Sequence, residues 1–197
     1  LGAHILANMS SQAVAEGRGR EAVELARAAV AGSTGADVHP QVLARIQTAE
    51  ASAQALTGAR DAFTWSIRRA EQALDEDSEL PPPAWVSFFS RTHWAGSAVR
   101  GLIDLRSETD VGQYQEQALG TGGSRRTRAL HSALLAIAHA RARDVDQACA
   151  LADDALDAAA AVRSHRVARR LARLDEFFRP HGGTPPARRV LDRLAQA

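Results

Sequence analysis

The stretch DVDQACALADDA, from Asp144 to Ala155, sets three alanines at spacings that repeat elsewhere in the chain. The stretch GRGREAVELARAA, from Gly17 to Ala29, carries the same pattern. The matching residues are Ala22, Ala26 and Ala29 in one stretch and Ala148, Ala152 and Ala155 in the other. In an α-helix these positions share one face, and a face of small residues lets a second helix approach closely. Each ladder follows a short polar turn, so both stretches predict a tightly packed antiparallel helix pair.

Helical periodicity extends over nearly the whole chain of 197 residues, and strand patterns are almost absent. Alanine, the best helix former, makes up about a fifth of the residues. Clusters of glycine and proline separate the helical segments. The sequence predicts helices over 3–16, 20–31, 40–56, 59–77, from after the prolines at 81–83 to 105, and over 110–119, 125–142, 144–162, 164–178 and 186–196.

Local signals define several of these helices. Asp110 and Asp144 are each followed three residues later by glutamine, which predicts a capping box at both positions. In the segment 164–178 the apolar residues are spaced to form one stripe that must be buried against the last helix pair. The stripe consists of Val167, Leu171, Leu174 and Phe178.

Two further pairs offer weaker forms of the ladder. The second pair has Ala62, Ser66 and Arg69, and the third has Val111, Gln115 and Ala118. The pattern resembles the tetratricopeptide repeat (TPR), whose second helix carries small residues against the first. The resemblance implies an all-α, right-handed superhelix of about four pairs with a capping helix over residues 1–179, then a linker and a short helix over 180–197.

The chain departs from the TPR pattern in two respects. The aromatic and glycine positions of a TPR first helix are Ser132, Ala136 and His139 in the fourth pair, and the period exceeds the usual repeat of about 34 residues. An alanine-rich helical bundle without a repeat is the alternative interpretation.

The chain is also similar to the C-terminal sensor regions of helix-turn-helix regulators from GC-rich bacteria. The matching segments are 6–9 with 17–22, 144–152 and 162–167. This resemblance implies that a DNA-binding domain precedes Leu1, and the lack of an initiator methionine favours a fragment. It also implies a cytoplasmic domain that binds a peptide, a protein or a small signal molecule. The alternative is an interaction or dimerisation scaffold with no small ligand.

Composition excludes several partners. The net charge of +1 and the pI of about 8.3 give no global attraction to nucleic acid or to membranes. No apolar run approaches the roughly 18–20 residues of a membrane span. The region 163–193 holds nine arginines, but it lacks a helix-turn-helix spacing and interleaved aromatic residues, so we expect no direct nucleic-acid contact. A homodimer formed by exchange of the last helix remains open.

No catalytic motif occurs, so the sequence predicts a protein that is not an enzyme and needs no cofactor or metal. His131 and His139 could share a helix face, but no cysteine or acid completes a metal set. Cys149, the only cysteine, excludes an intrachain disulfide and is expected to be buried. The loop 120–124 could bind an anion beside Arg125 and Arg126, although a simple turn is the better interpretation.

In a TPR array the first helix of each pair lines the concave surface. The register gives the polar positions of a predicted groove, which are His4, Asn8, Ser11, Gln47, Gln54, His93, Ser97, Arg100, Asp104 and Arg141. We expect Asn8, Gln54, Arg100 and Asp104 at its centre, with Arg100 holding a carboxylate of the ligand. Six of the nine aromatic residues lie between Phe63 and Trp94 and could line part of a pocket. A solvated groove with no ligand explains the same residues.

Overall fold

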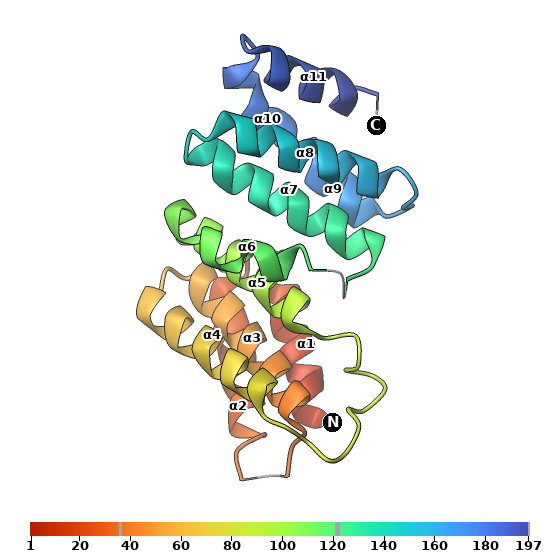
Figure 1. The fold of residues 1–197 in the computed structure, drawn as a ribbon. Coiled ribbons are helices and arrows are strands. Elements are labelled where there is room, and N and C mark those ends of the chain that lie inside the picture. The colour runs from red at the N-terminus through yellow and green to blue at the C-terminus, as the bar shows by residue number, and fades with distance from the viewer. Residues whose placement is uncertain (36, 121–122, 197) are drawn as a thin grey trace. The chain divides into compact units, whose positions relative to one another are not determined.

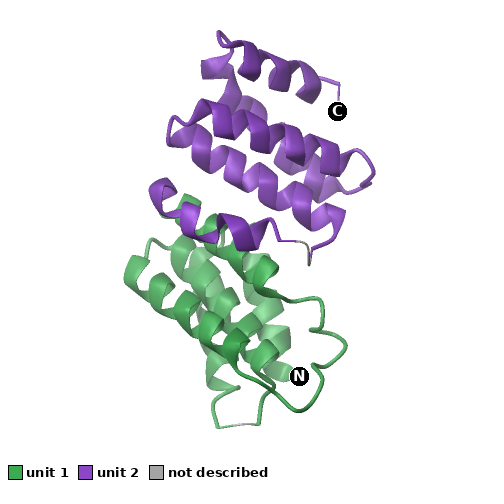
Figure 2. Cartoon of the chain, in the orientation of Figure 1, with its two compact units in different colours: residues 1–106 green, residues 107–197 purple. Residues whose placement is uncertain are grey.

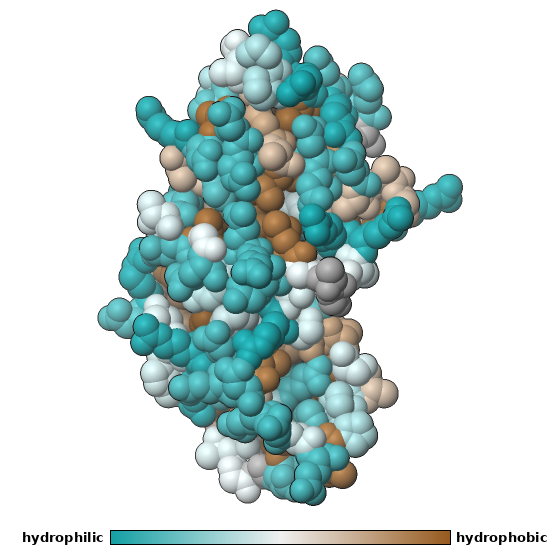
Figure 3. Space-filling model, viewed as in Figure 1, coloured by the Kyte–Doolittle hydropathy of each residue, from teal (hydrophilic) through white to brown (hydrophobic). Residues whose placement is uncertain are grey.

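A computed structural model describes residues 1–35, 37–120 and 123–196 of the chain. The fold is all-helical, with 74% of the residues in helices and no strand among the described residues (Figure 1). The chain divides into two compact units, Leu1–Arg106 and Ser107–Ala197, shown in different colours in Figure 2. We describe each unit by itself. The face drawn in Figure 3 consists mostly of hydrophilic residues, with smaller patches of hydrophobic residues between them.

Unit 1 is built around its third helix. Helices α1 (Gly2–Ala15) and α2 (Gly19–Ala31) form one pair, and α3 (Pro40–Leu56) and α4 (Arg60–Asp75) form a second. Helix α5 (Arg91–Asp104) packs against α3 and α4. Because α3 contacts all four of the other helices, its residues are largely buried.

Unit 2 is built around the pair of α7 (Arg125–Arg141) and α8 (Val145–Ala159). Helix α11 (Pro185–Leu194) packs on α8, and α9 (His165–Ala172) and α10 (Leu174–Phe178) pack on α7. The remaining elements are the short helix α6 (Gly112–Ala118) and the 3-10 turns η1 (Glu108–Asp110) and η2 (Arg179–His181).

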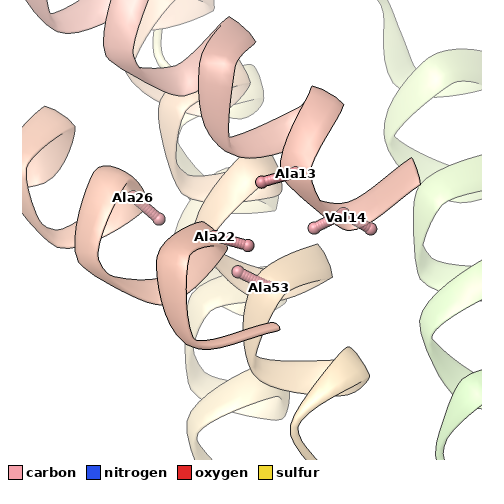
Figure 4. Close-up of a cluster of buried hydrophobic side chains, with 5 residues drawn as sticks. All are labelled: Ala13, Val14, Ala22, Ala26 and Ala53. Atoms are coloured by element: carbon pink, nitrogen blue, oxygen red, sulfur yellow. The ribbon is translucent and has the colours of Figure 1, made fainter. Parts of the chain in front are cut away.

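Both alanine ladders are fully buried, as the sequence predicts. All six alanines, in α2 and α8, have no exposed surface. Figure 4 shows Ala22 and Ala26 of α2 close to Ala13 and Val14 of α1, with Ala53 of α3 completing the cluster. The all-α prediction and the packed helix pairs are therefore confirmed, whereas the right-handed TPR-like superhelix stays a prediction.

The predicted register of the second pair is wrong by one helical turn. Ala62 and Arg69 are only half-buried, and the small buried face of α4 is Ser66, Ala70 and Ala73. Phe63 explains the shift, because its ring must be buried and it fills the space where a fourth small residue would lie. The ring occupies a gap beside α5 that is left by Gly101.

Three predicted helix ends also differ. Helix α5 begins at Arg91 and not directly after the prolines, because residues 84–88 form turns. Asp110 does not cap α6, whose N-cap is Val111, whereas the Asp144 carboxylate does accept from Gln147 N at 3.3 Å. The segment 164–178 breaks at Arg173 into α9 and α10. Its apolar stripe is nevertheless buried, as predicted.

The helices α1, α3, α5 and α7 all end in the same kind of turn. The residue after each C-cap has a positive φ: Gly17 (76°), Gly58 (79°), Arg106 (58°) and Arg143 (63°). After α1, α3 and α7 the two hydrogen bonds of a Schellman motif are present. This recurrence is a structural repeat that does not depend on the alanine ladder.

Arg143→Gly should therefore raise the free energy of unfolding by about 0.5–1 kcal/mol. A left-handed conformation costs a residue with a Cβ about 1–2 kcal/mol, and the greater freedom of glycine in the unfolded chain offsets part of that gain. The Arg143 side chain is exposed, so little contact is lost. Urea denaturation followed by circular dichroism measures the change.

Arg126→Gly is the matched control for this substitution. Arg126 is also exposed, but it lies in the first turn of α7. Glycine should lower stability there, by up to about 1 kcal/mol, because it has a poor helix propensity. Equal losses at both positions would contradict a strained backbone at Arg143.

Candidate functional site

Arg45 of α3 is a cation that the surrounding protein does not neutralise. Its Nη2 donates to Asn8 Oδ1 at 3.0 Å and to Ser11 Oγ at 3.1 Å, both on α1. The side chain is half-buried, and burial lowers the pKa of its guanidinium. No carboxylate of the described residues forms an ion pair with it. A partly desolvated charge of this kind is costly unless something binds to it.

The hydrogen bonds around Arg45 fix the orientation of the neighbouring groups. Arginine can only donate, so the Asn8 oxygen faces it and the Asn8 amide nitrogen faces His4 Nε2, at 2.9 Å. His4 Nε2 must then accept, which places the ring proton on Nδ1. That Nδ1 is buried and has no hydrogen-bond partner in the described structure. The site therefore contains a buried N–H donor as well as a cation.

Two histidines near Arg45 are held in the neutral form. Burial lowers the pKa of His4 and of His93, and the positive charge of Arg45 lowers both further. An unperturbed histidine is already mostly neutral at pH 7. The positive charge of the Leu1 amino group also lowers the pKa of His4, so Arg45 is the only charged side chain among these groups near neutral pH.

The segment between α4 and α5 adds aromatic surface to the site. The Trp85 ring lies against His4, with 4.3 Å between the ring centroids. The segment is held to α3 by Gln41, whose amide nitrogen donates to the carbonyl oxygens of Val86 and Phe89. We call the group formed by His4, Asn8, Ser11, Arg45, Trp85 and His93 the Arg45 cluster.

The structure brings together some of the predicted groove residues. Asn8, Ser11 and His93 belong to the Arg45 cluster, as does His4. Ser97 donates to the His93 carbonyl oxygen one turn earlier in α5, so its hydroxyl is engaged within its own helix. Arg100 and Asp104 bind each other, with 3.4 Å between Nε and Oδ2, so the charge of Arg100 is already balanced.

Other predicted groove residues lie elsewhere. Gln47 is only 2% exposed, because α3 is covered on several sides, and its Oε1 is buried with no hydrogen-bond partner in the described structure. Gln54 also has a buried, unpartnered Oε1. Arg141 lies in unit 2, where it pairs with Glu108 at 2.9 Å and sits over the Phe177 ring.

Sequence reasoning missed Arg45 itself. The register assumed for α3 put Gln47 and Gln54 toward the groove, whereas Arg45 faces Asn8 and Ser11. One signal was available, because Arg45 and Glu50 are the only charged residues of α3. Glu50 faces the other way and accepts from Ser66 of α4 at 3.0 Å. A lone charge in a central helix that lacks an opposite charge on the same face indicates such a site.

The remaining candidates are accounted for by structural contacts. Cys149 is buried. Its burial raises the pKa of its thiol, and the negative charge of nearby Asp153 raises it further. His139 contacts Asp144 and Gln115, whereas His131 contacts the Ala118 carbonyl oxygen. No group of three potential metal ligands occurs among the described residues.

Two arginine-containing segments were candidates for binding an anion or nucleic acid: the basic region 163–193 and the loop 120–124 beside Arg125 and Arg126. Arg193 of α11 binds Asp153 and Asp157 of α8, both at 2.6 Å, so this part of the basic region pairs with acidic residues of the same chain. The predicted anion loop at 120–124 includes Thr121 and Gly122, which lie outside the described residues.

Comparisons with protein-family models, with curated proteins and with solved structures give no match for this chain. None of the described helices is long and apolar enough to cross a membrane.

Arg45→Met should raise the free energy of unfolding of the ligand-free chain by about 1 kcal/mol. Methionine keeps the length and apolar contacts of the side chain and removes a desolvated charge, and binding sites commonly sacrifice stability of this size. Asn8 is exposed and Ser11 half-buried, so water can replace the lost hydrogen bonds. The pKa of His93 should also rise toward its ordinary value, which NMR titration measures.

Arg60→Met is the comparison for this substitution. The Arg60 guanidinium donates to the Leu105 carbonyl oxygen at 3.0 Å, so its loss should lower stability by about 0.5–1.5 kcal/mol. If Arg45→Met destabilised the chain as much as Arg60→Met, Arg45 would be a structural residue and the case for a binding site would be lost.

Proposed function

We propose that this chain is the ligand-binding regulatory domain of a bacterial transcriptional regulator, and that unit 1 binds the ligand at the Arg45 cluster. The single observation that carries the proposal is Arg45, a half-buried guanidinium with no carboxylate partner among the described residues. In this proposal the ligand is a peptide, a protein segment or a small signal molecule, and the protein acts in the cytoplasm.

The chemistry of the cluster favours binding over catalysis. The Ser11 hydroxyl donates its proton to the Ala7 carbonyl oxygen at 2.9 Å, so no base activates it as a nucleophile. His4 Nε2 already accepts from Asn8. The cluster contains no carboxylate that could act with a histidine as an acid–base pair. Its groups can donate hydrogen bonds and balance a charge, which is what recognition requires.

The regulatory role rests on the sequence resemblance and on the helix pairs. The buried ladders of α2 and α8 and the recurrent turns after α1, α3, α5 and α7 support a TPR-like array. The coding sequence upstream of Leu1 tests the transcriptional part directly. If it encodes no DNA-binding helices, that part of the proposal fails while ligand binding remains.

Native mass spectrometry of the chain purified gently from its own host tests ligand binding. We expect excess mass that disappears on denaturation and that is reduced in Arg45→Gln. Arg100→Gln is the comparison, because Asp104 already balances Arg100. A ligand-free mass for the natural chain in every preparation would count against the proposal.

An interaction scaffold is the second candidate, and exposed apolar residues on α1 favour it. Leu1, Ile5 and Met9 are 82%, 51% and 47% exposed and recur every fourth residue, so they share one side of the helix. A second copy or another protein could cover them. Light scattering should then show a dimer that Ile5→Glu dissociates. A monomer at all concentrations would rule out a dimer formed through this side of α1.

A further inference from the structure

The net charge of the Arg45 cluster indicates the charge of the ligand that would bind there. Arg45 supplies one positive charge, and the lowered pKa values of His4 and His93 leave both rings neutral near pH 7. Arg100, the arginine that the sequence places at the centre of the groove, is balanced by Asp104. A partner with one negative charge would therefore neutralise the site, whereas a doubly charged group would leave an unbalanced charge partly removed from water.

The hydrogen-bonding groups of the cluster are complementary to an acceptor. Asn8 and Ser11 both engage Nη2 of Arg45, so the N–H groups on Nε and Nη1 donate to no described residue. His4 contributes a buried Nδ1–H, and only 9% of the His4 side chain and backbone is exposed. All of these groups are donors, and the buried His4 donor is unfavourable without an acceptor.

An apolar surface adjoins these donors. Trp85 is 39% exposed and Phe88 is 56% exposed, although both belong to a segment that is tied to α3 through Gln41. Phe88 also meets His93 edge-on, with 5.7 Å between the ring centroids. Large aromatic side chains that remain exposed beside a desolvated cation are typical of a ligand site.

From these three observations we infer that the Arg45 cluster binds a carboxylate whose carrier is a flat apolar group resting on Trp85. The carboxylate belongs either to a small organic acid or to the free C-terminus of a peptide with an apolar last residue. A carboxylate has one charge and two coplanar oxygens, which suit the planar guanidinium. This inference rests on the proposed function and specifies the ligand class of the same site.

The test uses 3-phenylpropanoate and its neutral analogue 3-phenylpropanamide with the full chain. NMR follows the Arg45 Nε–H and the Trp85 indole N–H at tens of millimolar probe, where even millimolar affinity is visible. We expect the acid to shift both signals and the amide to leave the Arg45 signal unchanged. Phenyl phosphate, which carries nearly two charges, should bind more weakly than the acid.

Substitutions separate the two arginines. Arg45→Gln should weaken binding of the acid at least about tenfold, because a charge-assisted contact is lost. Arg100→Gln should leave the affinity unchanged. An N-acetylated tripeptide ending in phenylalanine, with a free or an amidated C-terminus, identifies the source: tighter binding of the free peptide than of 3-phenylpropanoate assigns the site to peptides, and the reverse assigns it to small acids.

Three results would overturn the inference. They are equal shifts of the Arg45 signal with acid and amide, tighter binding of phenyl phosphate, and binding of the acid that survives Arg45→Gln. A neutral or cationic compound found by native mass spectrometry would also overturn it, yet would leave the proposed binding function intact. If no compound co-purifies and no probe binds, both the inference and the proposed function fail.

Discussion

Trp94→Ala is expected to lower the free energy of unfolding by about 3–5 kcal/mol, the range found when a large buried aromatic side chain is truncated. Trp94 of α5 is only 1% exposed, and its indole N–H donates to the Ile67 carbonyl oxygen of α4 at 3.0 Å. The substitution removes the largest fully buried side chain of the molecule and a hydrogen bond between two helices of unit 1.

Trp65→Ala is the matched control, because Trp65 is 54% exposed on α4. The Arg69 guanidinium lies over its ring, with 4.5 Å between the guanidinium carbon and the ring centroid. This exposed cation–π contact contributes about 0.5–1 kcal/mol, so the loss should stay within that size. Urea denaturation followed by circular dichroism compares both variants, and a small loss for Trp94→Ala would show that α5 does not pack on α4 as described.

Gly101→Ala is expected to lower the free energy of unfolding by about 2–3 kcal/mol, because it inserts a methyl group against the buried Phe63 ring of α4. A Cβ at this position would lie 2.9 Å from Phe63 Cζ and still closer to Cε2. The ring is buried and cannot turn away without displacing other residues.

Gly112→Ala should act in the opposite direction. An added Cβ at Gly112 has no neighbouring atom within 4 Å, and the residue opens α6. Alanine should stabilise that helix by up to about 1 kcal/mol through its higher propensity. We therefore expect alanine to lower the free energy of unfolding at Gly101 and to raise it at Gly112. A gain at both would mean that Phe63 relaxes freely.

Sequence patterns predicted the helices well because their signals are local. The buried ladders of α2 and α8 and the stripe of α9 and α10 follow from periodicity alone. The register of α4 could not be predicted, because it depends on the fit between Phe63 and a glycine on another helix. The start of α5 was wrong for a related reason, since the turns at residues 84–88 are held in part by Gln41, far away in the sequence.

The candidate site was predicted only on α1 and in part on α5. Asn8, Ser11 and His93 follow from the first-helix register, and all three belong to the Arg45 cluster. Arg45 did not follow, because its importance lies in the missing opposite charge, which is a property of three-dimensional neighbours. Arg100 looked equivalent in the sequence, yet a carboxylate one helical turn later neutralises it.

The intrinsic reporter groups of the chain are divided between the two units. All three tryptophans, Trp65, Trp85 and Trp94, belong to unit 1, whereas the single thiol, Cys149, is buried in unit 2. Tryptophan fluorescence, excited selectively so that Tyr114 of unit 2 does not contribute, therefore follows the melting of unit 1, and the rate at which a thiol reagent modifies Cys149 follows the opening of unit 2. Coincident transitions would identify one cooperative folding block, and separate ones would identify two independent foldons within an unlabelled chain.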